Sequence, residues 1–303
     1  MSLTLHRLHQ TKITGVAALP GVQHRNLNFG TAHLARQAAG QIFSSFLAIH
    51  RQEPVTPLAT TDIKIALSAL GITGLAVDAA DGLVCYIAKV DQVGKNATGS
   101  VHLKATAQKG NFYPMDLATS LDDPAILNFE FHALKKSGAA IWAWTTNQSL
   151  PANDTVGDLY KLDAGTVKFN GTARSGVQSA HVQFGVKHTK HKEAGDVSPT
   201  AAYVDDQPVM VEFSTLHALD FTEVTQDGLA VTSWSFFLRA FKNDLIQWDD
   251  TDAKHIKFSG GAGLLYPHQL QHARGPAHSG LRFVPQTDGT ADPIVLAFDQ
   301  LIA

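Results

Sequence analysis

The chain of 303 residues repeats itself at long range, and the matching stretches keep the same order along its length. Residues 21–30 read GVQHRNLNFG, and residues 176–185 read GVQSAHVQFG. Residues 110–114 read GNFYP, and residues 263–267 read GLLYP. The offset between matching residues stays between 152 and 156, a drift that small insertions and deletions in loops would produce. The sequence therefore predicts an internal duplication.

The length of the repeat indicates which architectures are compatible with it. Solenoids and propellers repeat every few tens of residues, because each repeat is one supersecondary unit. A repeat of roughly 150 residues is instead the size of a whole domain with its own core. We expect two similar domains, residues 1–153 and 154–303, because the connecting stretch SLPANDTVGD is rich in turn-forming residues.

Composition is consistent with two packed cores. Apolar residues make up 44% of the chain and charged residues 17%, and the formal net charge is −3. This balance argues against a basic nucleic-acid-binding surface. The stretch MSLTLHRLHQTK lacks the apolar segment of an export signal, and no apolar run is long enough to span a bilayer. Cys85 lies in the apolar run LVCYIAKV, so we expect a buried, unreactive thiol.

Alternating or aromatic-rich runs predict that strands dominate the structure. In the run ILNFEFHAL, the side chains of Leu127, Phe129 and Phe131 share one face, as in a half-buried antiparallel strand. The predicted strands are residues 83–90, 100–107, 126–134, 139–144, 180–188, 209–215, 232–241 and 255–260.

Two short helices are predicted at corresponding places in the halves. Residues 60–71 begin with Thr60 as an N-cap and end at Gly71, with an apolar face of Ile63, Leu67 and Leu70. Residues 214–221 are their shorter counterpart. Residues 31–50 are a further candidate helix or a loop, and their counterpart is polar. The predicted fold is mainly β: two antiparallel β-sandwich or β-barrel domains, each with a short flanking helix.

Motifs that carry chemistry are missing from the sequence. It has no Gly-x-Ser-x-Gly, His-Glu-x-x-His or Cys-x-x-Cys motif, and residues 259–267 do not form a phosphate-binding loop. The 15 histidines lack the spacing of a zinc site, and residues 187–193 are expected to form an exposed basic loop. His102 and His255 occupy matching positions beside lysines, which favours outward-facing side chains. We therefore expect no catalytic, cofactor-binding or metal-binding residues, and no enzymatic activity.

Duplicated β domains without such a site are suited to symmetric assembly. Closed rings use heterologous interfaces, in which each unit presents one face to the next. Fusing two units into one chain preserves that geometry, and open sheet edges can then pair around the ring. The segments 1–20, 157–175 and 187–200 are long enough to reach neighbouring subunits.

In this architecture the chain resembles the tail-tube proteins of long-tailed bacteriophages, especially those that form trimeric, pseudo-hexameric rings. Residues 54–77, PVTPLATTDIKIALSALGITGLAV, and residues 288–298, DGTADPIVLAF, share the character of such proteins. The resemblance implies a structural virion protein of the tail, assembled in the host cytoplasm into stacked rings. Its partners would be further copies of itself and other tail proteins at the tube ends, with no membrane. DNA would pass through the lumen without specific binding.

Two alternatives remain open. One is a tail hub or distal tail protein with two tube domains. The other is a duplicated carbohydrate-binding β protein, in which tryptophan side chains would stack on sugars. Trp142 and Trp144 lie on one face of a predicted strand and match Leu296 and Phe298, which indicates a core or an interface. The four tryptophans are Trp142, Trp144, Trp234 and Trp248.

Overall fold

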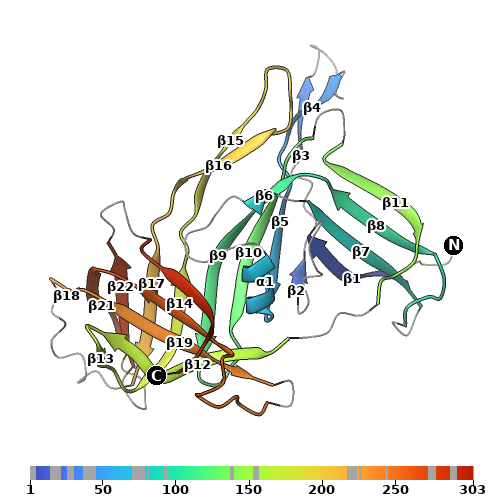
Figure 1. Cartoon of the computed structure of the whole chain (residues 1–303). Helices are drawn as coiled ribbons and strands as arrows, with labels where there is room; N and C mark the ends of the chain where they lie inside the picture. Colours follow the sequence, from blue (N-terminus) through green and yellow to red (C-terminus); the bar gives the residue numbers. More distant parts are fainter. Residues whose placement is uncertain are drawn as a thin grey trace.

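The computed structural model shows a chain built almost entirely of antiparallel strands, with α1 (Ile63–Ala69) as the one helix among the described residues (Figure 1). It describes residues 5–13, 22–25, 31–36, 46–69, 79–80, 82–91, 95–136, 140–152, 157–216, 224, 227–242, 245–271, 278–286 and 292–302. Within these residues no helix is long and apolar enough to cross a membrane. The mainly β prediction is confirmed.

A ten-stranded sheet runs through both halves of the chain. Its strand order is β18-β21-β22-β17-β14-β9-β10-β5-β2, and β6 pairs with one end of β9. The strands from the first half are β2 (Val22–Arg25), β5 (Val55–Thr60), β6 (Ala79–Ala80), β9 (Gly110–Ser120) and β10 (Ile126–Ala133). Those from the second half are β14 (Val177–Gln183), β17 (Met210–Thr215), β18 (Leu229–Val231), β21 (Gly263–Gln271) and β22 (His278–Pro285).

Two smaller sheets pack against this large sheet. One has the order β1-β7-β8-β11, and the other has the order β13-β12-β19-β20-β23. The first contains β1 (Leu5–Ile13), β7 (Leu83–Val90), β8 (His102–Ala107) and β11 (Trp142–Gln148). The second contains β12 (Leu159–Phe169), β13 (Thr172–Ala173), β19 (Trp234–Phe241), β20 (His255–Gly260) and β23 (Val295–Gln300).

Aromatic side chains fill the space between the layers. In the first half, the rings of Phe131 on β10 and Trp142 on β11 lie 6.2 Å apart, centroid to centroid. In the second half, Phe213 on β17 lies 5.9 Å from Phe236 on β19, in a T-shaped contact. Such contacts stabilise the packing of two sheets beyond the burial of apolar area. Among the described residues no sheet closes into a barrel, so the sandwich alternative is the one that the structure supports.

Strands occupy the same order in the two halves. The order β1-β7-β8-β11 corresponds to β12-β19-β20-β23, and β6-β9-β10-β5-β2 corresponds to β18-β21-β22-β17-β14. Register irregularities correspond as well. The β9–β10 ladder shifts beyond Pro114, and the β21–β22 ladder shifts beyond Pro267. Ala105 lies three residues after His102, and Phe258 lies three residues after the matching His255. Trp144 pairs with Ala105, and Leu296 pairs with Phe258. Trp144 therefore corresponds to Leu296 rather than to Phe298.

Each half carries a two-stranded hairpin outside the main sheets. The hairpins are β3 (Thr31–Arg36) with β4 (Phe46–Gln52), and β15 (Lys187–His191) with β16 (Ala201–Asp206). Both project from the same end of the molecule (Figure 1). The helix expected for residues 31–50 is therefore wrong: the Ala- and Leu-rich pattern suits a helix, but pairing with a second strand decides the structure. The basic loop expected at residues 187–193 is largely strand β15.

The helix α1 confirms the central part of the helix predicted for residues 60–71, but Thr60 belongs to β5 and Gly71 lies outside the described residues. Ile63, Ala66 and Leu67 are buried, while Leu70 lies outside the described residues. Asp62, rather than Thr60, precedes the first turn, and its carbonyl accepts the first helical hydrogen bond from Ala66. The predicted start of the helix at residues 214–221 is wrong, because residues 214–215 belong to β17. The residues after Leu216 lie outside the described part of the chain.

Other expectations need correction. Of the segments expected to reach neighbouring subunits, residues 5–13 form β1, the edge strand of its sheet, and residues 159–169 form β12, and both pair with strands of their own chain. The predicted strand 180–188 is two strands, because Gly185 turns the chain with a φ of 62°. Each of the other predicted strand ranges overlaps a strand of the structure. Cys85 is buried, as expected.

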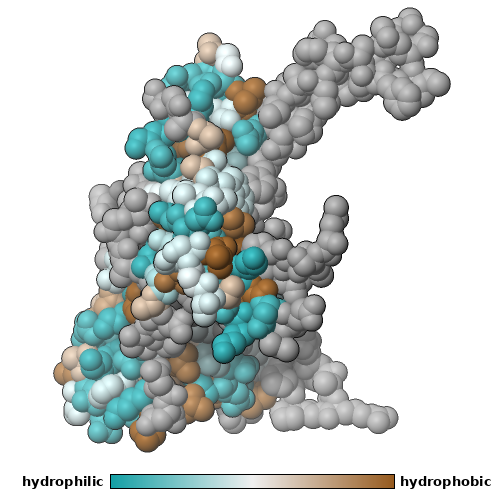
Figure 2. Space-filling view, turned by 90° about the vertical axis from the view of Figure 1, so that its right-hand side faces the viewer, coloured by the Kyte–Doolittle hydropathy of each residue, from teal (hydrophilic) through white to brown (hydrophobic). Residues whose placement is uncertain are grey.

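Figure 2 shows the side of the molecule on which β8 and β11 lie in Figure 1. Over the described residues, hydrophilic and hydrophobic side chains are mixed, and the hydrophobic ones are scattered in small groups. Isolated exposed apolar residues are normal on protein surfaces. This face of the described structure therefore does not stand out as an apolar docking surface.

Candidate functional site

The two halves meet along a continuous antiparallel seam between β9 and β14. Ser179 pairs with Ser120, His181 with Ala118, and Gln183 with Asp116. Beyond the seam, Phe184 donates its backbone N–H to the carbonyl of Met115 at 2.9 Å. Backbone pairing of this kind makes one sheet out of strands from two halves.

A polar stripe crosses the seam on the sheet face that is turned away from the core. His181 on β14 lies 3.4 Å from Asp116 on β9 (Nε2 to Oδ1) and 3.7 Å from Glu212 on β17 (Nδ1 to Oε2). Arg282 on β22 donates to Glu212 through Nε at 3.0 Å and Nη2 at 2.7 Å. Nη2 of Arg282 also donates to Nε2 of His268 on β21 at 2.9 Å.

Opposite charges in the stripe stabilise one another. The hydrogen bond to Asp116 raises the pKa of His181, and the same bond holds the pKa of Asp116 below its usual value. Burial acts to raise the pKa of Glu212, but Arg282 outweighs it, so that this pKa is lowered. The stripe is therefore a row of charges that are paired with one another.

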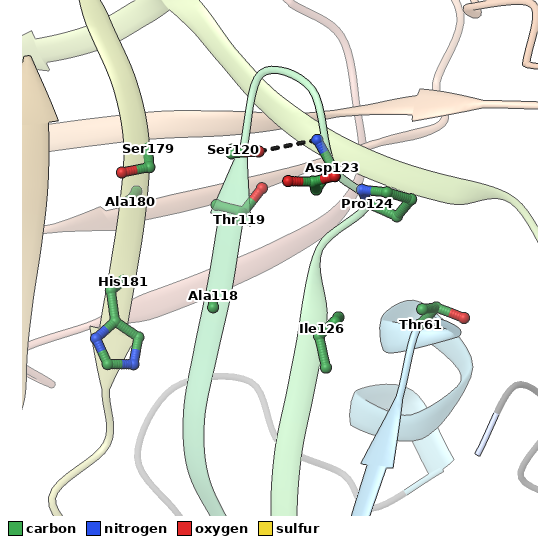
Figure 3. A pocket seen from close by; sticks show the side chains of 10 residues that line it. All are labelled: Thr61, Ala118, Thr119, Ser120, Asp123, Pro124, Ile126, Ser179, Ala180 and His181. Carbon is green, nitrogen blue, oxygen red and sulfur yellow. Dashed lines mark hydrogen bonds between the residues drawn. The ribbon is translucent and has the colours of Figure 1, made fainter. Parts of the chain in front are cut away.

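A shallow pocket of about 530 Å³ lies at the end of the seam. Figure 3 shows its lining from β14, β9 and β10, from the turn between β9 and β10, and from Thr61 between β5 and α1. Ser120 accepts a hydrogen bond from the backbone N–H of Asp123 at 2.8 Å, which closes the turn after β9. Its walls combine small and apolar side chains with the polar side chains of Ser179, Asp123 and His181.

The β15–β16 hairpin folds back over the first half, where its His188 contacts two aromatic rings. His188 stacks on Tyr113 with ring centroids 4.9 Å apart and an interplanar angle of 12°. It also meets His132 edge to face at 4.2 Å. His132 donates from Nε2 to Glu130 at 2.8 Å. Burial lowers the pKa of both His132 and His188, so the neutral rings are the favoured forms.

Hydrogen bonds and ion pairs fix the rest of the hairpin on the first half. The Asn111 side chain donates to the carbonyl of Ala202 at 3.0 Å, and Lys109 donates to the carbonyl of Thr200 at 2.6 Å. Lys192 pairs with Glu53 at 2.7 Å, and Lys135 pairs with Asp196. The hairpin is thus a built interface between the two halves.

The strands that correspond to β9 and β14 are β21 and β2, and they lie near opposite ends of the ten-stranded sheet. In β9, residues 111–112 pair with β6 and residues 116–120 pair with β14. In β21, residues 263–265 pair with β18, and within the described chain no strand flanks its later residues on that side. The counterpart of β14 is β2, the terminal strand at the other end. Both edges have the backbone geometry to add a further strand.

Sequence reasoning placed two histidines wrongly. His102 and His255 were expected to face outward, but their exposed fractions are 2% and 0%. Nδ1 of His102 accepts the backbone N–H of Lys89 at 3.0 Å, and Nδ1 of His255 accepts that of Ala240 at 3.0 Å. Each histidine satisfies an amide at the end of a strand ladder, so its role is structural.

The contact of Tyr113 with His132 and His188 was not predicted, although the repeated Gly-x-x-Tyr-Pro pattern gave a signal for the tyrosine. Among the described residues, no group of three His, Cys, Asp or Glu side chains is placed to hold a metal ion. No protein-family model and no curated protein sequence matches the chain. The fold and these surfaces therefore carry the functional argument.

Proposed function

We propose that this chain is a structural subunit that assembles with copies of itself into rings stacked as a tube, as in a bacteriophage tail. One observation carries the proposal: the seam between β9 and β14 has an equivalent in β21 and β2, whose edges are unpaired within the described residues. Adding β2 of one copy to β21 of the next would repeat the contact that already joins the two halves. Such head-to-tail addition is a heterologous interface.

The matching strand orders support an origin by internal duplication, with domains at residues 1–153 and 154–303. If the two domains are equivalent, the operation that relates them inside the chain also relates the second domain to the first domain of the next copy. Repeating the operation closes a ring when the rotation allows it. A homotrimer with a pseudo-sixfold axis is the assembly that we propose.

The polar stripe supports a role for the outer face of the large sheet as the wall of a lumen. Its charged groups are paired with one another, as for Arg282 with Glu212 and His181 with Asp116. Passage of DNA requires weak, sequence-independent contact, and paired charges leave no basic track for phosphates. The tube would be part of the virion, assembled in the host cytoplasm, with other tail proteins at its ends.

The carbohydrate-binding alternative loses support from the tryptophan positions. Trp142 and Trp234 are buried, and Trp248 lies beneath Lys242, whose Nζ is 4.3 Å from the ring centroid. Trp144 is 49% exposed, and one exposed ring is a weak basis for a sugar platform. The tail hub remains a rival within the same class, because it would use the same domains in a single ring.

Negative-stain electron microscopy of the purified protein, together with its mass in solution, tests the proposal. Rings with pseudo-sixfold outlines that stack into tubes would support the tube, and single rings that never stack would support the hub. A chain that stays monomeric at high concentration would contradict both. A glycan-binding screen on the same sample separates the carbohydrate alternative.

A further inference from the structure

Three residues of the second half stand where the β15–β16 hairpin is anchored in the first half. In the ladders of β9 with β10, Asn111 pairs with His132, and Tyr113 lies two residues further along β9. In the ladders of β21 with β22, Leu264 pairs with Val284, and Tyr266 lies two residues further along β21. Tyr266 is therefore the register equivalent of Tyr113, and Leu264 and Val284 are those of Asn111 and His132.

The two sites differ in what covers them. Tyr113 is fully buried, beneath His188 of the hairpin. Leu264, Tyr266 and Val284 are each only partly buried, and among the described residues no hairpin lies over them. An apolar surface at a position that is covered in the first half indicates that a similar hairpin covers it in the assembly.

The hairpin β3–β4 is the equivalent of β15–β16. Both hairpins have a register shift near their start, after which His33 pairs with Ile49 in one, and His188 pairs with Val204 in the other. His33 thus stands at the position in β3 that His188 has in β15.

The chain's own β3–β4 hairpin cannot supply this cover. It follows β2 at one end of the ten-stranded sheet, whereas Tyr266 lies on β21 near the other end. Seven strand spacings of about 4.8 Å separate β2 from β21, or about 34 Å along the sheet. A second copy of the chain, added edge to edge, brings its hairpin directly to β21.

Composition of the two hairpins matches the two surfaces. The strands of β15 and β16 read KHTKH and AAYVDD, and they cover Asn111, Tyr113 and His132. The strands of β3 and β4 read TAHLAR and FLAIHRQ, which are richer in large apolar residues. The more apolar hairpin suits the more apolar surface of Leu264, Tyr266 and Val284.

We infer that the β3–β4 hairpin of one copy docks over Leu264, Tyr266 and Val284 of the next copy, with position 33 of β3 over Tyr266. This inference rests on the proposed self-assembly and names its contact. It gives the chain two linked attachment points, the sheet edge and the hairpin, in place of one. Two contacts made together hold a subunit far more tightly than either does alone.

Crosslinking tests the contact directly. In a Cys85→Ala background, His33→Cys with Tyr266→Cys should give ladders of covalent multimers with a short bifunctional maleimide. The matched control is His188→Cys with Tyr113→Cys, which should crosslink within one chain and run as a monomer. Each pair is examined on denaturing gels, and the same samples are imaged for rings or tubes.

The outcomes separate the two proposals. Rings or tubes without covalent multimers from the first pair, while the control pair crosslinks, would overturn the hairpin contact and leave the proposed function standing. Absence of any assembly in the Cys85→Ala background would overturn both. A second variant needs no crosslinker: Tyr266→Ala should raise the concentration needed for assembly at least tenfold. An unchanged threshold would overturn the contact.

Discussion

Tyr113 and His188 stack with their ring centroids 4.9 Å apart, and so join strand β9 of the first half to the hairpin of the second. The stack is a packing contact, surrounded by Asn111, His132 and Glu130, and it is one of the contacts that hold the β15–β16 hairpin. The same tyrosine in the second half, Tyr266, is partly exposed. Tyr113 therefore has a ring contact with a hairpin that Tyr266 lacks within the described residues.

Tyr113→Ala should destabilise the dilute, unassembled chain strongly, by about 3 kcal/mol, because it removes a fully buried ring from the core and from the stack. Tyr266→Ala in the same dilute sample should cost about 1 kcal/mol or less, because its ring is partly exposed. Urea unfolding followed by circular dichroism measures both. Equal losses for the two variants would contradict the distinction between a covered and an uncovered site.

The hairpin should loosen in acid. Burial lowers the pKa of His132 and of His188 below the ordinary value of 6.5, with Lys190 also lowering both. Below pH 6.5 such a histidine takes up a proton more readily in the unfolded chain than in the folded one. The folded state therefore keeps its full stability above pH 6.5 and loses stability as the pH falls through the folded pKa. Hydrogen-exchange protection at the Lys135 amide, which donates to Pro199, should therefore fall between pH 7.5 and 5.

His188→Phe is the matched variant for this effect, since it keeps a ring on Tyr113 but cannot take up a proton. Its loss of Lys135 protection in acid should be smaller than that of the parent chain, with exchange rates corrected for intrinsic pH dependence. Identical losses in the two proteins would show that protonation at His188 does not loosen the hairpin.

The stability that the His181–Asp116 pair gives to the seam should fall as the pH rises, whereas the stability of the hairpin falls in acid. The pKa of His181 is raised by its hydrogen bond to Asp116, so its contribution is complete below about 6.5 and is lost as pH rises through the raised value. The pKa of Asp116 is lowered, first by His181, so its contribution is complete above about 3.8 and is lost as pH falls through the lowered value. The pair is strongest between these limits.

Asp116→Asn should therefore lower stability by about 0.5 kcal/mol at pH 5.5 and by less at pH 8.5, a small effect because both side chains are partly exposed. Asp206→Asn, which breaks the exposed pair with Lys187, is the control and should be nearly neutral. Urea midpoints at the two pH values measure the difference. A larger effect of Asp116→Asn at pH 8.5 than at pH 5.5 would contradict the sign.

Strands and turns could be predicted from the sequence because their signals are local. The alternation of Leu127, Phe129 and Phe131 places one face of β10 in the core, and their exposed fractions are 0%, 1% and 0%. The hairpin β3–β4 could not be predicted in this way. Its Ala- and Leu-rich segments are compatible with a helix, and only the pairing of β3 with the next strand, β4, makes them strands.

The candidate surfaces were harder to predict than the fold. The Tyr113–His188 stack joins two halves, so no local pattern around either residue indicates it. His255 belongs to a period-two strand, but it turns inward because the amide of Ala240 needs an acceptor at the end of its ladder. An amide that lacks a ladder partner can be identified only when the register of both strands is known.

His255→Ala should destabilise the second half by about 1–3 kcal/mol, because it leaves the buried N–H of Ala240 without an acceptor. The carbonyl of Asp249 also loses its partner, Nε2 of His255 at 3.0 Å. His255→Asn is the control, since an amide oxygen can stand near the position of Nδ1 and restore part of the loss. Thermal unfolding measures both, and equal losses for Ala and Asn would contradict the role given to Nδ1.

Gly263 begins β21 directly against the Phe283 ring, and a Cβ at this position would overlap that ring and the carbonyl of Val284. Gly263→Ala should therefore cost about 1–3 kcal/mol, because the backbone carbonyl cannot move away as a flexible side chain would. Gly261→Ala is the matched control two residues earlier, where no atom lies within 4 Å of an added Cβ, and it should change stability by about 0.5 kcal/mol or less. Gly110→Ala, against Phe131 and the carbonyl of His132, should repeat the loss in the first half. Urea unfolding of the three variants measures these differences, and a Gly263→Ala protein as stable as Gly261→Ala would show that the ladder of β21 and β22 adjusts without strain.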